Sequence, residues 1–152
     1  MSIRKILCLY IYSNTSLGKS AAILLARRGH KVYASVHYED QINSIKEIAN
    51  SENLNIEVFK LDILQKEERE LILNYNIDVF ISNAAIGDSG SVADVNIERI
   101  KNVFETNVFS NLHMIQLALK NMILNKKEGR IIILSSLVRK NSYAFSFSIL
   151  CI

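Results

Sequence analysis

Five apolar runs rich in β-branched residues alternate along this chain with segments whose apolar residues recur at helical spacing. The runs are nearly continuous in hydrophobicity, which is typical of strands buried on both faces of a sheet. Strands are expected at residues 6–12, 31–36, 55–61, 77–82 and 130–135, and helices at 17–28, 40–50, 63–75 and 96–125. Strands and helices that alternate over short connections predict parallel strands joined by right-handed crossovers. We therefore expect one doubly wound α/β domain over residues 1–152, without internal repeats or linkers.

The expected helix at 96–125 is long and carries a stripe of apolar residues at spacings of three and four. The stripe consists of Ile100, Val103, Phe104, Val108, Leu112, Ile115, Leu119 and Met122. Residues with this period lie on one side of a helix, so the sequence predicts one long apolar face.

Charge and cysteine content limit the classes of function. The 18 basic and 15 acidic residues give a net charge of only +3, which gives no reason to propose a nucleic acid or an anionic membrane as partner. No apolar run approaches the roughly 20 residues of a membrane-spanning helix. Cys8 and Cys151 lie at opposite ends and are interpreted as reduced thiols, so we expect a cytoplasmic protein. The three histidines, His30, His37 and His113, have no metal-like spacing, and we expect no metal site.

The loop after the first expected strand, SNTSLGKS at residues 13–20, allows two interpretations. It is one glycine short of a P-loop, in which Lys19 would contact the β/γ-phosphates and the Ser20 hydroxyl would hold magnesium. That chemistry also needs an acidic residue at the end of another apolar strand. Only Asp62 offers one, and a lysine interrupts the strand before it. A P-loop nucleotide hydrolase is therefore the less favoured interpretation.

Polar residues follow the later strands in an ordered series. Asp62 follows the third strand, residues 83–85 read Asn-Ala-Ala after the fourth, Asn107 lies on the long helix, and Ser136 follows the fifth strand. In order and placement these motifs resemble the short-chain dehydrogenase/reductase family over nearly the whole chain. The resemblance implies a Rossmann-type sheet and hydride transfer between NAD(P) and a small carbonyl or alcohol substrate.

The resemblance also implies cofactor-binding roles for Gly18, Asp62, Asn83, Ala84 and Ala85. Gly18 is the only glycine that remains of the family's pattern Thr-Gly-x-x-x-Gly-x-Gly. In relatives the aspartate after the third strand touches the adenine. Two other interpretations stay open: Asp62 could cap a helix over the residues that follow, and Asn83 could satisfy backbone groups at a strand end.

Tyr12 and Ser16 stand at two of the family's glycine positions. Side chains there take up the space through which the backbone approaches the pyrophosphate, so we predict no nicotinamide binding in the micromolar range. At the end of the second strand an acidic residue would select NAD, and an arginine nearby would favour NADP. Val36 and His37 occupy these places, which leans toward NADP with His37 as a cofactor contact.

Ser136 and Asn107 are the catalytic residues that the resemblance implies. In the family a tyrosine exchanges a proton with the substrate oxygen, and a lysine four residues later lowers the pKa of that tyrosine. The serine hydrogen-bonds the same oxygen, and the asparagine holds a water of the proton relay. Tyr143 is the only tyrosine after Ser136, Phe147 stands four residues beyond it, and the 152 residues contain no Tyr-x-x-x-Lys.

We therefore expect the cofactor-binding part of a reductase, truncated relative to the family and inactive as it stands, with its last apolar strand left as an exposed edge. A second possibility is a non-catalytic domain that forms a homo-oligomer or pairs with another subunit through the 96–125 helix. The third is the P-loop hydrolase. Lys19, Arg27 and Arg28 are expected on a solvated helix face.

Overall fold

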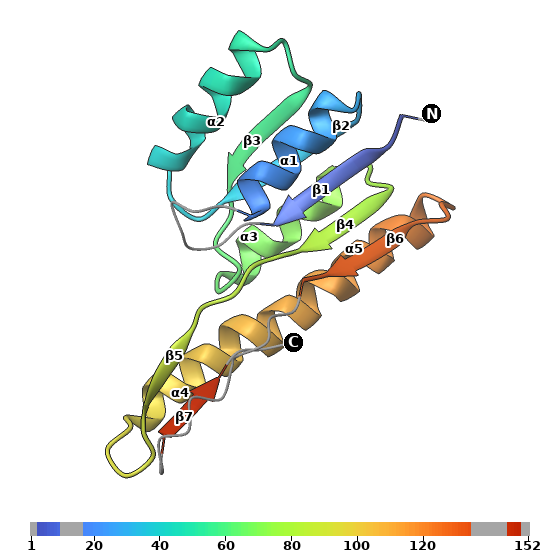
Figure 1. Ribbon diagram of the computed structural model, residues 1–152. Helices are drawn as coiled ribbons and strands as arrows, with labels where there is room; N and C mark the ends of the chain where they lie inside the picture. Colours follow the sequence, from blue (N-terminus) through green and yellow to red (C-terminus); the bar gives the residue numbers. More distant parts are fainter. Residues whose placement is uncertain (1–2, 10–16, 135–145, 150–152) are drawn as a thin grey trace.

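The computed structural model describes residues 3–9, 17–134 and 146–149 of the chain. Five parallel strands form a sheet in the order β3-β2-β1-β4-β6 (Figure 1). They are β1 (Lys5–Leu9), β2 (Lys31–Val36), β3 (Ile56–Lys60), β4 (Val79–Ser82) and β6 (Arg130–Ile133). The order reverses at β1, because β2 and β3 lie on one side of it and β4 and β6 on the other. The doubly wound sheet and its five expected strands are confirmed, and β2 has the expected bounds.

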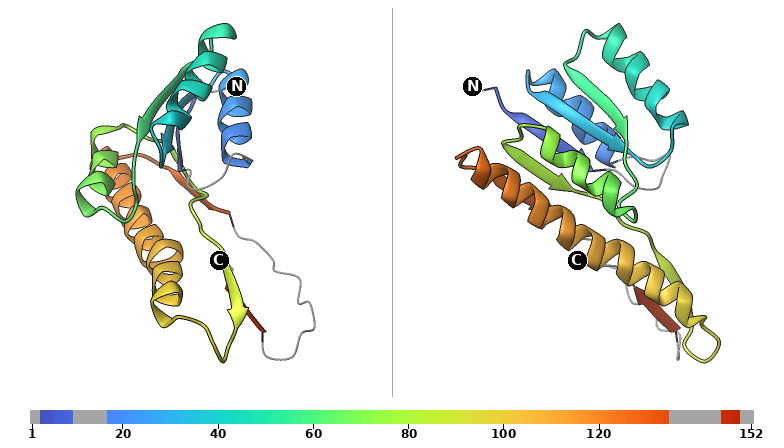
Figure 2. Two further views of the ribbon diagram at one scale, coloured as in Figure 1. Left: turned by 90° about the vertical axis from the view of Figure 1, so that its left-hand side faces the viewer. Right: turned by 180° about the vertical axis from the view of Figure 1, so that it is seen from behind.

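Helices cover both faces of this sheet (Figure 2). On one face α1 (Leu17–Arg27) packs Ala22 and Ala26 against apolar residues of the central strands, and α2 (Asp40–Ser51) follows beside β3. On the other face the fully buried Leu7 and Phe80 pack in one cluster with Met114 of α5 (Asn111–Leu124). The central strands β2 and β4 are largely apolar and buried because each of their faces meets a helix layer.

The long helix is present, but it is not a uniform α-helix. It consists of α4 (Ile97–Phe104), the π-helical segment η2 (Glu105–Ser110) and α5. Asn96 caps its start, with Oδ1 accepting a hydrogen bond from the N–H of Glu98 at 2.8 Å. A π turn holds more residues than an α turn, so it shifts the helix face that is presented beyond it.

The apolar face expected for this helix is buried only in part: Val103 and Met122 are buried, and Ile115 packs against the core. Phe104, Leu112 and Leu119 are 42%, 50% and 45% exposed. The buried side instead carries polar residues together with apolar ones, namely Val103, Thr106, Asn107, Ser110, Asn111, Met114, Leu117, Ala118, Asn121 and Met122. The π turn shifts the phase, and the buried amides bind backbone groups of neighbouring segments, so hydrophobicity alone did not identify the buried side.

The helix expected at 63–75 begins later than expected. The structure has α3 at Lys66–Glu70, followed by the 3-10 helix η1 at Leu71–Asn74. Ile63 is fully buried before the helix starts. Asp62 therefore does not cap a helix, and the residues between β3 and α3 form a turn.

Two further strands were not expected from the sequence. β5 (Asp88–Ser91) pairs antiparallel with β7 (Ser146–Ile149), and the pair lies beside α4, away from the five-stranded sheet (Figure 1). The sequence of β5 is Asp-Ser-Gly-Ser, which has no apolar alternation to indicate a strand. The expected exposed apolar edge is present at β6, where Ile132 and Ile133 are both exposed.

Candidate functional site

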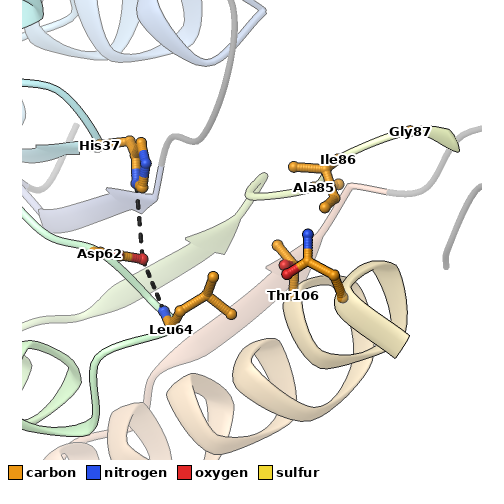
Figure 3. Close-up of a pocket in the computed structure, with 8 residues that line it drawn as sticks. His37, Asp62, Leu64, Ala85, Ile86, Gly87 and Thr106 are labelled. Atoms are coloured by element: carbon orange, nitrogen blue, oxygen red, sulfur yellow. Dashed lines mark hydrogen bonds and ion pairs between the residues drawn. The ribbon is translucent and has the colours of Figure 1, made fainter. Parts of the chain in front are cut away.

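The segments that follow β2, β3 and β4 meet at the carboxyl edge of the sheet. Together with the start of the long helix they enclose a cavity of about 490 Å³. Its lining residues are His37, Asp62, Leu64, Ala85, Ile86, Gly87, Asn102 and Thr106. Figure 3 shows His37 and Asp62 on one side and Ile86 and Thr106 on the other. The cavity lies beside the reversal of strand order, where doubly wound sheets bind their ligands.

Asp62 is held in a tight turn after β3. Its Oδ1 accepts a hydrogen bond from the N–H of Leu64 at 2.9 Å, and its own N–H donates to Oε2 of Glu68 at 2.6 Å. The turn fixes the carboxylate at the rim of the cavity. His37 comes from the end of β2, and its Nδ1 lies 3.7 Å from the same Oδ1. Two of the sequence-derived cofactor residues are thus brought together.

The segment after β4 carries three more of these residues. Asn83 is half-buried, Ala84 is buried, and Ala85 is exposed at the cavity. The segment is tied to the long helix through Asn107, whose Oδ1 accepts from the N–H of Ile86 at 2.8 Å. The Nδ2 of Asn107 donates to the carbonyl of the same residue at 2.7 Å. Both polar atoms of this buried side chain therefore hold the cavity wall.

Thr106 is the site residue that sequence reasoning missed. Its side chain is 2% exposed and lines the cavity, and its Oγ1 has no hydrogen-bond partner among the described residues. A buried hydroxyl without a partner costs free energy, and a ligand in the cavity could supply the missing hydrogen bond. Its place beside Asn107 was the available signal, but a single threonine within an apolar helix does not by itself indicate a binding residue.

Gly18 and Lys19 lie at the start of α1. Gly18 is buried, whereas the Nζ of Lys19 donates to Oγ of Ser44 on the exposed side of α2 at 3.2 Å. Arg27, on the same helix, forms an exposed bidentate ion pair with Glu52 at 2.7 and 2.6 Å. The solvated helix face expected for Lys19 and Arg27 is thus observed. Tyr12, Ser16 and Ser136 lie outside the described residues.

The described ranges also bear on metal sites and on membrane-spanning helices. No group of three or more His, Cys, Asp or Glu side chains there could hold a metal ion. No helix in the same part of the chain is long and apolar enough to cross a bilayer.

A cavity at the switch point of a parallel sheet is the place where doubly wound α/β proteins bind their ligands. The family described as short chain dehydrogenase matches residues 9–148, and the chain belongs to this family. The family uses NAD(P), and the predicted resemblance of the chain to this family is confirmed.

Individual relatives are similar at modest identity. The probable short-chain type dehydrogenase/reductase VdlC of Helicobacter pylori is 30% identical over 138 residues, which are 88% of this chain and 49% of VdlC. The (S)-acetoin-forming diacetyl reductase of Staphylococcus epidermidis is 26% identical, over 84% of this chain and 52% of the reductase. A solved variant of actinorhodin polyketide ketoreductase with NADPH has a TM-score of 0.78 at 19% identity, covering 88% of this chain and 53% of that one.

The chain spans about half the length of the curated relatives that it matches. The likeness to the solved ketoreductase shows a shared fold.

Proposed function

We propose that this chain is the cofactor-binding part of an NAD(P)-dependent oxidoreductase that acts on small carbonyl or alcohol substrates. The observation that carries the proposal is the cavity at the switch point. There the buried hydroxyl of Thr106 has no hydrogen-bond partner among the described residues and lies beside residues of the family pattern. The nicotinamide of such a cofactor supplies or accepts the hydride. Relatives named as a diacetyl reductase and as a ketoreductase with NADPH support this reaction class.

The cavity suits the adenosine end of the dinucleotide. Asp62 would contact the adenine, with its carboxylate already oriented by the turn at Leu64. His37 stands where the ribose 2′ position is read, and its imidazole offers a hydrogen-bonding group there. Ala84 and Ala85, with Asn83, would pass beneath the cofactor. Thr106 adds a hydrogen bond that the family pattern did not suggest.

Affinity and turnover of the 152 residues alone are expected to be low. Tyr12 and Ser16 replace glycines in the loop that approaches the pyrophosphate, so binding would be weaker than the micromolar range. Asn107 and Ser136 are the family's catalytic positions, but no Tyr-x-x-x-Lys accompanies them. Without that phenol and lysine the proton transfer to the substrate oxygen lacks its donor. We propose that the 152 residues alone do not catalyse the oxidation of NADPH by carbonyl substrates. We also propose that the protein works in the reducing environment of the cytoplasm.

The proposal is tested by comparing NADPH binding to the wild type and to Thr106→Val by saturation-transfer NMR. Valine keeps the volume and removes the hydroxyl, and the loss of one hydrogen bond of about 0.5–1.5 kcal/mol corresponds to roughly two- to tenfold weaker binding. Ser51→Ala removes an exposed hydroxyl on α2 and serves as the control. We expect weakening in Thr106→Val alone. Equal binding by all three proteins, or none by the wild type, would contradict the proposal.

Self-association through the long helix is a second proposal, and it rests on an exposed apolar face. Phe109, Leu112, Leu119 and Ile123 are all exposed and follow one another at helical spacings of three, seven and four. Exposed apolar area of this kind marks protein interfaces. Light scattering should give a mass above 17.3 kDa that falls toward the monomer in Leu119→Glu. A monomeric wild type would contradict this proposal and leave the cofactor proposal untouched.

A further inference from the structure

The π-helical segment η2 contributes Thr106 to the cavity, and the side chain of Asn111 binds backbone carbonyls of this segment. Asn111, the residue that follows η2, is buried. Its Nδ2 donates to the carbonyl of Thr106 at 3.0 Å and to that of Asn107 at 3.3 Å. A π turn disturbs the regular series of helical hydrogen bonds, and a side chain that binds its carbonyls stabilises it.

The same side chain also reaches the end of β4. Its Nδ2 donates to the carbonyl of Ala84 at 2.7 Å, and its Oδ1 accepts from the hydroxyl of Ser82 at 2.5 Å. An amide offers two donor hydrogens and one acceptor oxygen, so every polar atom of Asn111 is in use. These bonds join the π turn to the strand end from which the cavity wall continues.

Two residues of the π turn bear on the cavity, one by lining it and the other by holding its wall. Thr106 lies within the π turn and lines the cavity, and its hydroxyl has no hydrogen-bond partner in the part of the chain that the structure describes. Asn107, next in the turn, holds the N–H and carbonyl of Ile86 with its own amide. Movement of the turn would displace the hydroxyl and the Ile86 segment together.

We propose that Asn111 is a positioning residue that fixes the π turn and thereby places the Thr106 hydroxyl and the Ile86 backbone around the cavity. The expected effect of Asn111 on ligand binding rests on the proposed cofactor function. Its expected effect on the positions of Thr106 and Ile86 does not rest on that function.

Asn121 offers a matched control on the same helix. It is also buried, and its Nδ2 donates to the carbonyl of Tyr75 at 2.7 Å, with longer contacts to Ile72 and Leu73. It therefore binds backbone carbonyls as Asn111 does, but at the end of η1 and away from the residues that line the cavity. A purely structural role for Asn111 would make the two alanine variants behave alike.

The test is amide hydrogen exchange at Ile86 in Asn111→Ala and Asn121→Ala, with the N–H of Val32 in the central sheet as the reporter of global stability. We expect protection at Ile86, relative to Val32, to fall about tenfold in Asn111→Ala and to stay unchanged in Asn121→Ala. Equal changes in the two variants, or wild-type protection in Asn111→Ala, would overturn the proposal. If Asn111→Ala does not fold, Asn111→Ser applies the same criterion. Its hydroxyl can bind the carbonyl of Asn107, so a smaller loss at Ile86 is expected.

Titration with NADPH separates this inference from the cofactor proposal. If the wild type binds, Asn111→Ala should bind at least several-fold more weakly than Asn121→Ala. Equal binding by the two variants would overturn the link between Asn111 and the cavity. If no protein binds NADPH, the cofactor proposal fails, and the exchange at Ile86 still decides whether Asn111 positions the turn.

Discussion

The carboxylate of Asp78 should make one of the larger polar contributions to stability. It precedes β4 at the amino edge of the sheet, where Oδ2 accepts from the N–H of Lys5 at 2.7 Å and Oδ1 accepts from Nζ of Lys127 at 2.6 Å. The Asp78 and Lys127 side chains are 16% and 23% exposed. Asp78 therefore joins β1, β4 and the segment before β6.

Burial alone would raise the pKa of Asp78, but the hydrogen bonds from Lys127 and Lys5 outweigh it and hold the pKa below its ordinary value. Hydrogen bonds to charged groups contribute about 1.5–3 kcal/mol each, and partial exposure reduces this, so Asp78→Ala should lose about 2–4 kcal/mol of unfolding free energy near neutral pH. For a chain of this length the midpoint of thermal unfolding should fall by roughly 5–15 °C.

The pH dependence has a definite sign. Because the folded pKa is depressed, the contribution is present above the ordinary carboxyl pKa of about 4 and is lost as the pH falls through the lower folded value. The unfolding free energies of the wild type and Asp78→Ala, measured with urea, should therefore differ by a constant amount between neutral and mildly acidic pH. The two values should converge at pH below the folded pKa of Asp78. A double-mutant cycle with Lys127→Met should give a coupling of about 1–2 kcal/mol. A difference that persists unchanged at low pH, or a coupling near zero, would refute this reasoning.

Two other substitutions have expected effects on stability. A Cβ at Gly129 would lie 2.9 Å from both Cγ and Cε of the buried Met122, so Gly129→Ala should cost about 1–3 kcal/mol by overpacking. Combined with Met122→Ala, the loss should be smaller than the sum of the two single losses in chemical denaturation; strict additivity would contradict the contact. Asn107→Ala removes both hydrogen bonds to Ile86 and should lower the unfolding free energy by about 1–3 kcal/mol. Thermal unfolding unchanged from the wild type would show that water replaces them.

Hydrophobic runs and their spacing were sufficient for the sheet. The strand at 31–36 has the expected bounds, because strands buried on both faces leave a continuous apolar signal. The segment at 88–91 left none, since its polar residues and glycine resemble a loop, and its pairing with 146–149 is not local in sequence. The helix at 66–70 began late because Ile63 is buried in the turn before it.

The long helix shows why the site was found only in part. Its buried side holds Asn107, Asn111 and Asn121, whose amides bind the backbone of segments that precede the helix. Those partners depend on the folded chain, so a hydrophobic pattern could not identify the buried amides. Asp62 and His37 were named because the family resemblance assigns cofactor contacts to the residues that follow the third and second strands. Thr106 was missed because its significance depends on the cavity.

The most direct measurement of the central claim is an amide chemical-shift titration of the wild type with NADPH. We expect shifts confined to the residues that line the cavity, with saturation only at about 1 mM or above, as the replaced glycines require. The largest should fall at His37, Leu64, Ile86 and Thr106. Shifts that cluster elsewhere on the molecule would contradict the assignment of the site, and saturation at a few micromolar would contradict the weakened cofactor loop.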